Sequence, residues 1–145
     1  MDRGLAITLA AVAGGLVALQ APINAGLARS TGGLPAALVS FSVGTLAMVV
    51  LVAATGKFGD LGSVLDVKWY YLTGGLLGAV YVTAALATVG TIGAGGLAAA
   101  VVAAELIASV AIDRAGLFGL DQIAVSPERL VGIGLLLAGT VLIVR

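Results

Sequence analysis

The feature that most restricts the fold of this chain is the run from Trp69 to Ala104, which contains no charged side chain. A transmembrane α-helix needs about 20 mainly apolar residues to cross the hydrocarbon layer of a bilayer. The run is therefore too long for one crossing and long enough for two. Shorter uncharged stretches at 4–28 and 34–55 each suit one crossing. The sequence predicts an all-α, polytopic membrane protein.

Composition supports this class and excludes several functions. Apolar residues make up 61% of the chain and charged residues 10%, with a mean hydropathy of +1.21, whereas a soluble domain has about 25% charged residues. Without cysteine or histidine, the chain lacks disulfides, a thiolate nucleophile and the usual transition-metal ligands. Its seven basic and seven acidic side chains cancel and form no basic face for nucleic acid. We expect no enzyme activity, cofactor, metal or nucleic acid partner.

Charges and glycine-rich breaks divide residues 1–145 into five helices of a single transmembrane domain. We expect these helices at residues 4–28, 34–55, 69–89, 97–112 and 127–144. The stretch "GTIGAGG" (90–96) is the expected break inside the long uncharged run. The first helix is interpreted as retained rather than cleaved, because Pro22 after "LQA" makes a poor signal-peptide site. In an alternative with four spans, the last helix lies at the membrane interface.

The distribution of basic residues predicts the orientation. An odd number of crossings places the termini on opposite sides of the membrane. The N-terminal side then receives Arg3, Lys57, Lys68, Arg114 and Arg129, and the other side receives Arg29 and Arg145. The positive-inside rule favours a cytoplasmic N-terminus in a bacterial-type inner membrane. Trp69 and Tyr70, at the entry of the third expected helix, are typical interface anchors.

Glu105 in "VVAAELIASVAID" is the only ionisable residue deep inside an expected span. A charge at that depth is costly, so the side chain should face protein or water. Ser109, four residues on, shares its helical face. Glu105 is either a proton-titrating or cation-binding carboxylate in a transport path, or a neutral acid that holds helices together. A shifted helix boundary is a third interpretation.

Two amides lie four residues apart in "ALQAPINAGLARS" (18–30) and project from one face of the first expected helix. They are Gln20 and Asn24. Pro22 between them cannot donate a backbone hydrogen bond, so the Ala18 carbonyl loses its usual partner. Broken or loosened helices near the midplane are where transporters bind substrates. The pattern thus indicates a substrate site with a helix break at Pro22, or else a packing kink whose amides bond between helices.

Other polar and aromatic side chains occur at membrane depth. Ser40 and Ser42 in "VSFSVGT", with Thr45, can bond back to their own helix, and Phe41 beside them could wall a cavity. Tyr81 could bring a hydroxyl inside the bundle. Small residues, as in the Gly74-x-x-x-Gly78 spacing, permit close helix contact. The candidate substrate and coupling residues are Gln20, Ser40, Phe41, Ser42, Asn24, Tyr81, Glu105 and Ser109.

The order of motifs resembles the YdcZ-type small membrane proteins of the drug/metabolite transporter superfamily. The resemblance runs through the whole chain and rests on "LQAPIN", "SFSVGT", "WYYLTGGLLGAVYV", "AIDRAGLFG" and "SPERLVGIGLLLAG". One departure is Ala104-Glu105, where the family usually resembles Gly-Gln. Glu105 is therefore special to this chain if it acts at all, which favours Gln20 and Asn24 as the site.

The resemblance also implies an architecture. Ten-helix relatives consist of two five-helix halves with inverted topology, and one five-helix chain is similar to one half. It implies an antiparallel homodimer, or a heterodimer with an oppositely oriented sibling. Few short helices enclose little cavity, so a path is more easily built between two such units.

These observations lead to competing functions. The first is a transporter subunit that moves a small organic solute by alternating access as an antiparallel dimer, with proton coupling as an option. The second is a non-transporting assembly or accessory protein whose polar residues only hold helices together. An ion channel is less favoured because no ring of charges is visible. The identity of the solute does not follow from the sequence.

Overall fold

The structure is a computed structural model that describes residues 1–145, and it consists of helices and turns without strands. The predicted all-α class is confirmed. Helices long and apolar enough to cross a membrane are Arg3–Thr31, Gly33–Ala54, Trp69–Ala115 and Pro127–Val144, which agrees with a polytopic membrane protein. The chain forms two compact units, Met1–Thr88 and Val89–Arg145, and each is described by itself.

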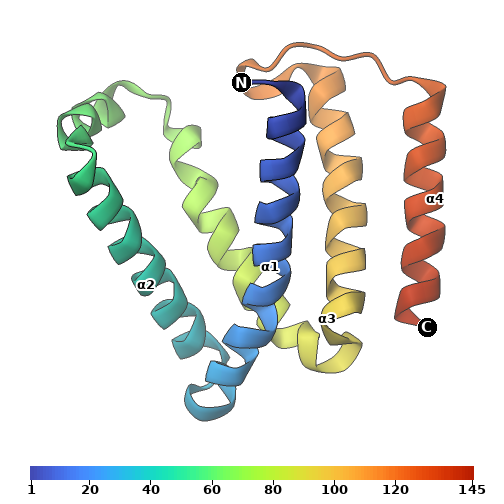
Figure 1. Cartoon of the computed structure of the whole chain (residues 1–145), viewed down its shortest axis with the longest axis horizontal. Coiled ribbons are helices and arrows are strands. Elements are labelled where there is room, and N and C mark those ends of the chain that lie inside the picture. The colour runs from blue at the N-terminus through green and yellow to red at the C-terminus, as the bar shows by residue number, and fades with distance from the viewer. The chain divides into compact units, whose positions relative to one another are not determined.

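The first unit begins with two long helices joined at one glycine. Helix α1 (Arg3–Thr31) is capped by Asp2, whose carboxylate accepts a hydrogen bond of 3.0 Å from the Gly4 amide. It ends at Gly32, where φ is +88°, a conformation that favours glycine. Helix α2 (Gly33–Ala54) follows directly. The two helices lie together near this joint and diverge toward their other ends (Figure 1).

The connection from α2 to the next helix is more regular than the expected loop. It contains two 3₁₀ helices, η1 (Lys57–Asp66) and η2 (Trp69–Thr73). The helix expected from Trp69 thus starts as a 3₁₀ turn and becomes α-helical at Gly74. Gly56, with φ of +68°, allows the sharp turn out of α2.

Helix α3 (Gly74–Ala115) has 42 residues and is interrupted at Gly93, where φ is +72° and ψ is 168°. The interruption falls within the expected break at 90–96. It divides α3 into helical segments at 74–92 and 94–115, so the chain has five long helical segments. Residues 74–88 belong to the first unit and the rest of α3 to the second.

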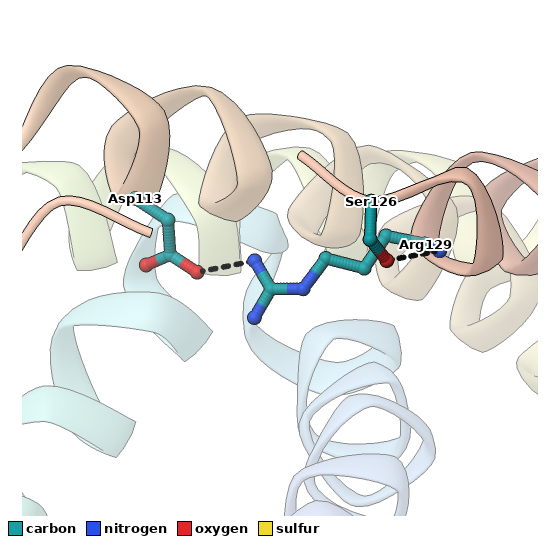
Figure 2. A network of polar contacts seen from close by, with 3 residues as sticks. All are labelled: Asp113, Ser126 and Arg129. Carbon is teal, nitrogen blue, oxygen red and sulfur yellow. Dashed lines mark hydrogen bonds and ion pairs between the residues drawn. The ribbon is translucent and has the colours of Figure 1, made fainter. Parts of the chain in front are cut away.

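The second unit is an antiparallel helical hairpin of α3 and α4 (Pro127–Val144), connected by a loop with a short 3₁₀ turn, η3 (Leu117–Gly119). Near one end, Arg129 Nη1 lies 3.2 Å from Asp113 Oδ2. Toward the other end, the Thr140 hydroxyl donates a hydrogen bond of 3.1 Å to the Ala99 carbonyl. Figure 2 shows the ion pair beside Ser126, the residue that caps α4 by accepting from the Arg129 amide. These contacts fix the register of the hairpin.

Little of the chain is buried against itself. The buried apolar side chains are small or medium in size, namely Ala36, Ala37, Val82, Ala85, Val89, Leu97 and Ala103. Large apolar side chains such as Leu16, Leu46 and Leu135 are more than 60% exposed. Because exposing so much apolar surface to water is unfavourable, lipid or another chain must cover these faces.

Candidate functional site

The one buried polar residue of the chain is Asn24 in α1, with 7% of its surface exposed. It lines a small cavity together with Gln20, one turn earlier, and Tyr81 of α3; Ala21, Val82, Ala85 and Leu86 complete the wall. The cavity has a volume of about 10 Å³, which is close to the space that one water molecule needs. Two amides and a phenol from two helices thus surround a space for one small polar group.

The amides at this cavity are not engaged with the rest of the chain. The side chains of Gln20, Asn24 and Tyr81 make no hydrogen bond within the protein. Their polar atoms remain accessible from outside, because every fully enclosed side-chain nitrogen or oxygen has a hydrogen-bond partner. The Asn24 amide therefore reaches the cavity with its donors and acceptor unused. Its polar atoms are not fully enclosed, so a small molecule that enters the cavity can serve as their hydrogen-bond partner. A water molecule or a solute could fill that role.

Gln20 also lines a second, larger depression between α1 and α2. The other lining residues are Ser40, Phe41, Gly44, Thr45 and Met48, and the volume is about 420 Å³. Neither Ser40 nor Thr45 bonds back to its own helix, in contrast to Ser42. The groove therefore offers an amide, two unbonded hydroxyls and an aromatic ring. Gln20 lines both this open groove and the small cavity.

Phe41 of α2 packs against Gly78 of α3. A Cβ added at Gly78 would lie 3.5 Å from Phe41 Cζ, so the ring is seated on a position without a side chain. The Gly74-x-x-x-Gly78 spacing thus provides a close approach at its second glycine, while Gly74 has no neighbour within 4 Å. Phe41 walls the groove and also packs against α3.

Two residues of the predicted pattern face away from these spaces. The Ser42 hydroxyl donates a hydrogen bond of 2.8 Å to the Leu38 carbonyl, and it lies about 200° around α2 from Ser40 at roughly 100° per residue. Helix α1 continues through Pro22, which is exposed. By the same geometry, Ala18 lies about 120° around α1 from Asn24 and about 160° from Gln20. The polar site is thus made by side chains and not by freed backbone.

Glu105 and Ser109 belong to the second unit, where both are exposed. On α3, Gly96 and Ala99 face α4, since a Cβ at Gly96 would lie 3.6 Å from Val144 Cγ2 and the Ala99 carbonyl accepts from Thr140. At roughly 100° per residue, Glu105 lies about 180° around the helix from Gly96. Neither side chain makes a hydrogen bond. The carboxyl group is thus directed away from α4, the helix that packs against α3 in this unit.

The aromatic cluster at the start of η2 lies where an interface anchor was predicted. The rings of Trp69 and Tyr70 meet edge to face with centroids 6.2 Å apart, and those of Tyr70 and Tyr71 are 4.6 Å apart. The Lys68 ammonium lies 5.9 Å from the centroid of the Tyr70 ring. Their function as an anchor in a bilayer stays a prediction. No group of three acidic side chains exists that could hold a metal ion.

Several lining residues were not singled out from the sequence. Met48 and Gly44 in the groove, and Val82 and Ala85 at the cavity, are the main ones. The positions of Phe41, Thr45 and Met48 follow the i, i+4, i+7 spacing of one helical face, which could have identified the groove-lining face of α2. Nothing in the sequence indicated that Tyr81 and Asn24 would line the same cavity, because they lie in distant segments.

Comparison with known proteins gives one match. The family model described as "Putative inner membrane exporter, YdcZ" matches residues 5–142, almost the whole chain. Neither a curated protein nor a solved structure matches. The family match supports a membrane transport role in general and an inner-membrane location, and it confirms the resemblance seen in the motifs.

Proposed function

The chain belongs to the YdcZ family, and on this premise we propose that it is a transporter subunit that moves a small organic solute across the membrane by alternating access. The family description is that of an exporter. The proposal adds the location of the site and the kind of solute. Its competitor is an accessory protein in which the same polar groups only hold helices together.

The observation that carries the proposal is the unbonded amide of Asn24 at the polar cavity. Substrate sites in membranes gather a few polar groups within an apolar wall, and here Gln20, Asn24 and Tyr81 supply donors and acceptors at one place. If these amides served only to hold the helices of this chain together, they would form hydrogen bonds with a neighbouring helix. The open groove beside Gln20, with Ser40 and Phe41, extends the space available to a solute.

The chemistry of these groups defines the class of solute. Neutral amides and hydroxyls both donate and accept hydrogen bonds, and no charged side chain lines either space. A neutral, hydrogen-bonding organic molecule with an apolar or aromatic part fits best. Coupling to protons or cations would come through Glu105, whose carboxyl group is not used within its own unit.

The active form in this proposal is an antiparallel dimer, with a second copy or an oppositely oriented sibling. Its support is the unusual exposure of apolar and polar surface in the single chain. Glu105 in particular cannot face hydrocarbon without a considerable penalty, and no helix of its unit covers it. A partner chain would cover that face and enclose the groove beside Gln20.

The proposal is tested by a solute screen on purified protein. Ligands that raise the thermal unfolding temperature are measured with the wild-type chain and with a Gln20→Ala, Asn24→Ala double variant. We expect stabilisation by bound solute to be lost in the double variant while the oligomer remains intact, because only the binding groups are removed.

The matched control is Thr8→Ala on the same helix. Thr8 is exposed and its hydroxyl bonds only to the Gly4 carbonyl of its own helix, so this change should leave solute binding intact. Dissociation of the oligomer in the double variant, with no solute stabilising even the wild type, would instead support the accessory protein.

A further inference from the structure

The segment that connects α2 to α3 has a regular repeat of side-chain types, and the proposed transport function does not involve it. Its first part, η1, is a 3₁₀ helix of ten residues, although most 3₁₀ helices have only three or four. A 3₁₀ helix has three residues per turn, so side chains at i and i+3 stand directly above one another. Any sequence period of three therefore becomes a straight row on its surface.

The sequence of η1 has this period. One row consists of the apolar side chains Phe58, Leu61 and Val64. A second row consists of the polar side chains Lys57, Asp60, Ser63 and Asp66, and a third of Gly59, Gly62 and Leu65. On an α-helix each step of three residues would turn by about 60° and scatter the rows. The sequence and the observed 3₁₀ geometry thus agree, and together they give the segment an apolar side and a polar side.

The apolar row is only partly covered by the chain, in which η1 contacts α2. Phe58 is 49% exposed, Leu61 53% and Val64 41%, and Leu65 in the adjoining row is 91% exposed. On the polar row, the Ser63 hydroxyl is already bonded to the Asp60 carbonyl at 2.7 Å. The segment therefore presents a narrow apolar strip backed by charges, the general pattern of an element that lies in a membrane surface.

The position of the segment in the chain indicates which surface covers the strip. It starts three residues after the end of α2 and runs into η2 and α3, so both of its ends are held where membrane-spanning helices leave and enter the bilayer. Trp69 and Tyr71, directly after it, are 76% and 50% exposed, and such rings favour the headgroup level. The lipid surface is thus the apolar phase within reach.

We propose that residues 57–66 lie flat in the interfacial layer of the membrane as an amphipathic 3₁₀ anchor, with Phe58, Leu61 and Val64 toward the acyl chains. Lys57 and Lys68 are balanced by Asp60 and Asp66. Binding to the lipid surface therefore rests on apolar contact and not on attraction to anionic lipids. It fixes the height and the rotation of the connection between α2 and α3.

A cysteine scan tests this directly, because the chain has no native cysteine. Each residue from 57 to 68 is replaced singly, labelled with a nitroxide, and measured in vesicles of zwitterionic phosphatidylcholine for collision with oxygen and with a water-soluble nickel chelate. We expect the ratio of oxygen to nickel collisions to be severalfold higher at 58, 61 and 64 than at 57, 60 and 63, repeating every third residue. Salt and added anionic lipid should leave the pattern unchanged.

Three outcomes would overturn the proposal. Uniform access to the nickel chelate would place the segment in water. Low access to both reagents at 58, 61 and 64 would indicate a protein partner on the strip. A pattern that appears only with anionic lipid would show that charge, not apolar contact, directs binding. If Phe58→Cys fails to fold, Leu61→Cys against Ser63→Cys provides the same contrast within one turn.

Discussion

The two units of this protein use polar groups in opposite ways. In the second unit, the hydroxyl of Thr140 and the charges of Asp113 and Arg129 join α3 to α4. In the first unit, the amides of Gln20 and Asn24 join nothing, although Asn24 is buried. Polar groups that bond within the chain stabilise it, while polar groups that are held without partners are available to bind something else. This difference separates the candidate site from the scaffold.

The strongest challenge to this comparison is Asn24→Leu, which keeps the branched shape of the side chain but removes the amide. We expect solute flux into proteoliposomes to fall by about tenfold or more, since an amide gives two hydrogen bonds of about 1 kcal/mol each. The free energy of unfolding should change by less than about 1 kcal/mol, because no hydrogen bond within the chain is lost. A large loss of stability with unchanged flux would assign Asn24 to the scaffold.

Glu105→Gln addresses a polar group of the second unit that does not join α3 to α4. We expect the variant to fold and assemble, because Glu105 makes no hydrogen bond within the chain, and we expect the pH dependence of solute flux to flatten. The control is Glu128→Gln, in the first turn of α4. A pH profile that matches the wild type would remove the coupling role from Glu105.

The smallest effect is expected from the ion pair of the hairpin. The side chains of Arg129 and Asp113 are 36% and 27% exposed, so Asp113→Asn should lower the free energy of unfolding by about 1 kcal/mol or less, without altering solute affinity. The exchange Asp113→Arg, Arg129→Asp should recover part of the loss. Asp121→Asn, in the same loop but in no ion pair, is the control. If Asp113→Asn and Asp121→Asn lowered the free energy of unfolding equally, the ion pair would contribute nothing specific to stability.

The sequence was sufficient for local features of the fold. The uncharged runs predicted the class, and the glycines of 90–96 predicted the break at Gly93, since a left-handed residue is easily accommodated only by glycine. Gln20 and Asn24, four residues apart on one helix, line a common space, and their role as a substrate site stays a prediction. Each of these inferences depends on neighbours in the chain.

What could not be predicted depends on contacts between distant segments or on the less common helix type. No local signal indicates that Tyr81 and Asn24 line one cavity or that Asp113 pairs with Arg129. Residues 57–66 carry charges between two expected helices, which favours a loop, and their period of three fits neither an α-helix nor a strand. Ser40 and Ser42 were grouped as neighbours in sequence, yet they face opposite sides of α2.

The interruption of α3 has a consequence for how the chain is made. Unbroken, its 42 residues would form a rod of about 63 Å at 1.5 Å per residue, roughly twice the thickness of the hydrocarbon layer. An added Cβ at Gly93 would meet no atom within 4 Å, so only the local backbone strain at φ of +72° and ψ of 168°, about 1–3 kcal/mol, resists another residue there. During biosynthesis, a residue without a side chain therefore decides whether the insertion machinery receives one oversized segment or two that fit.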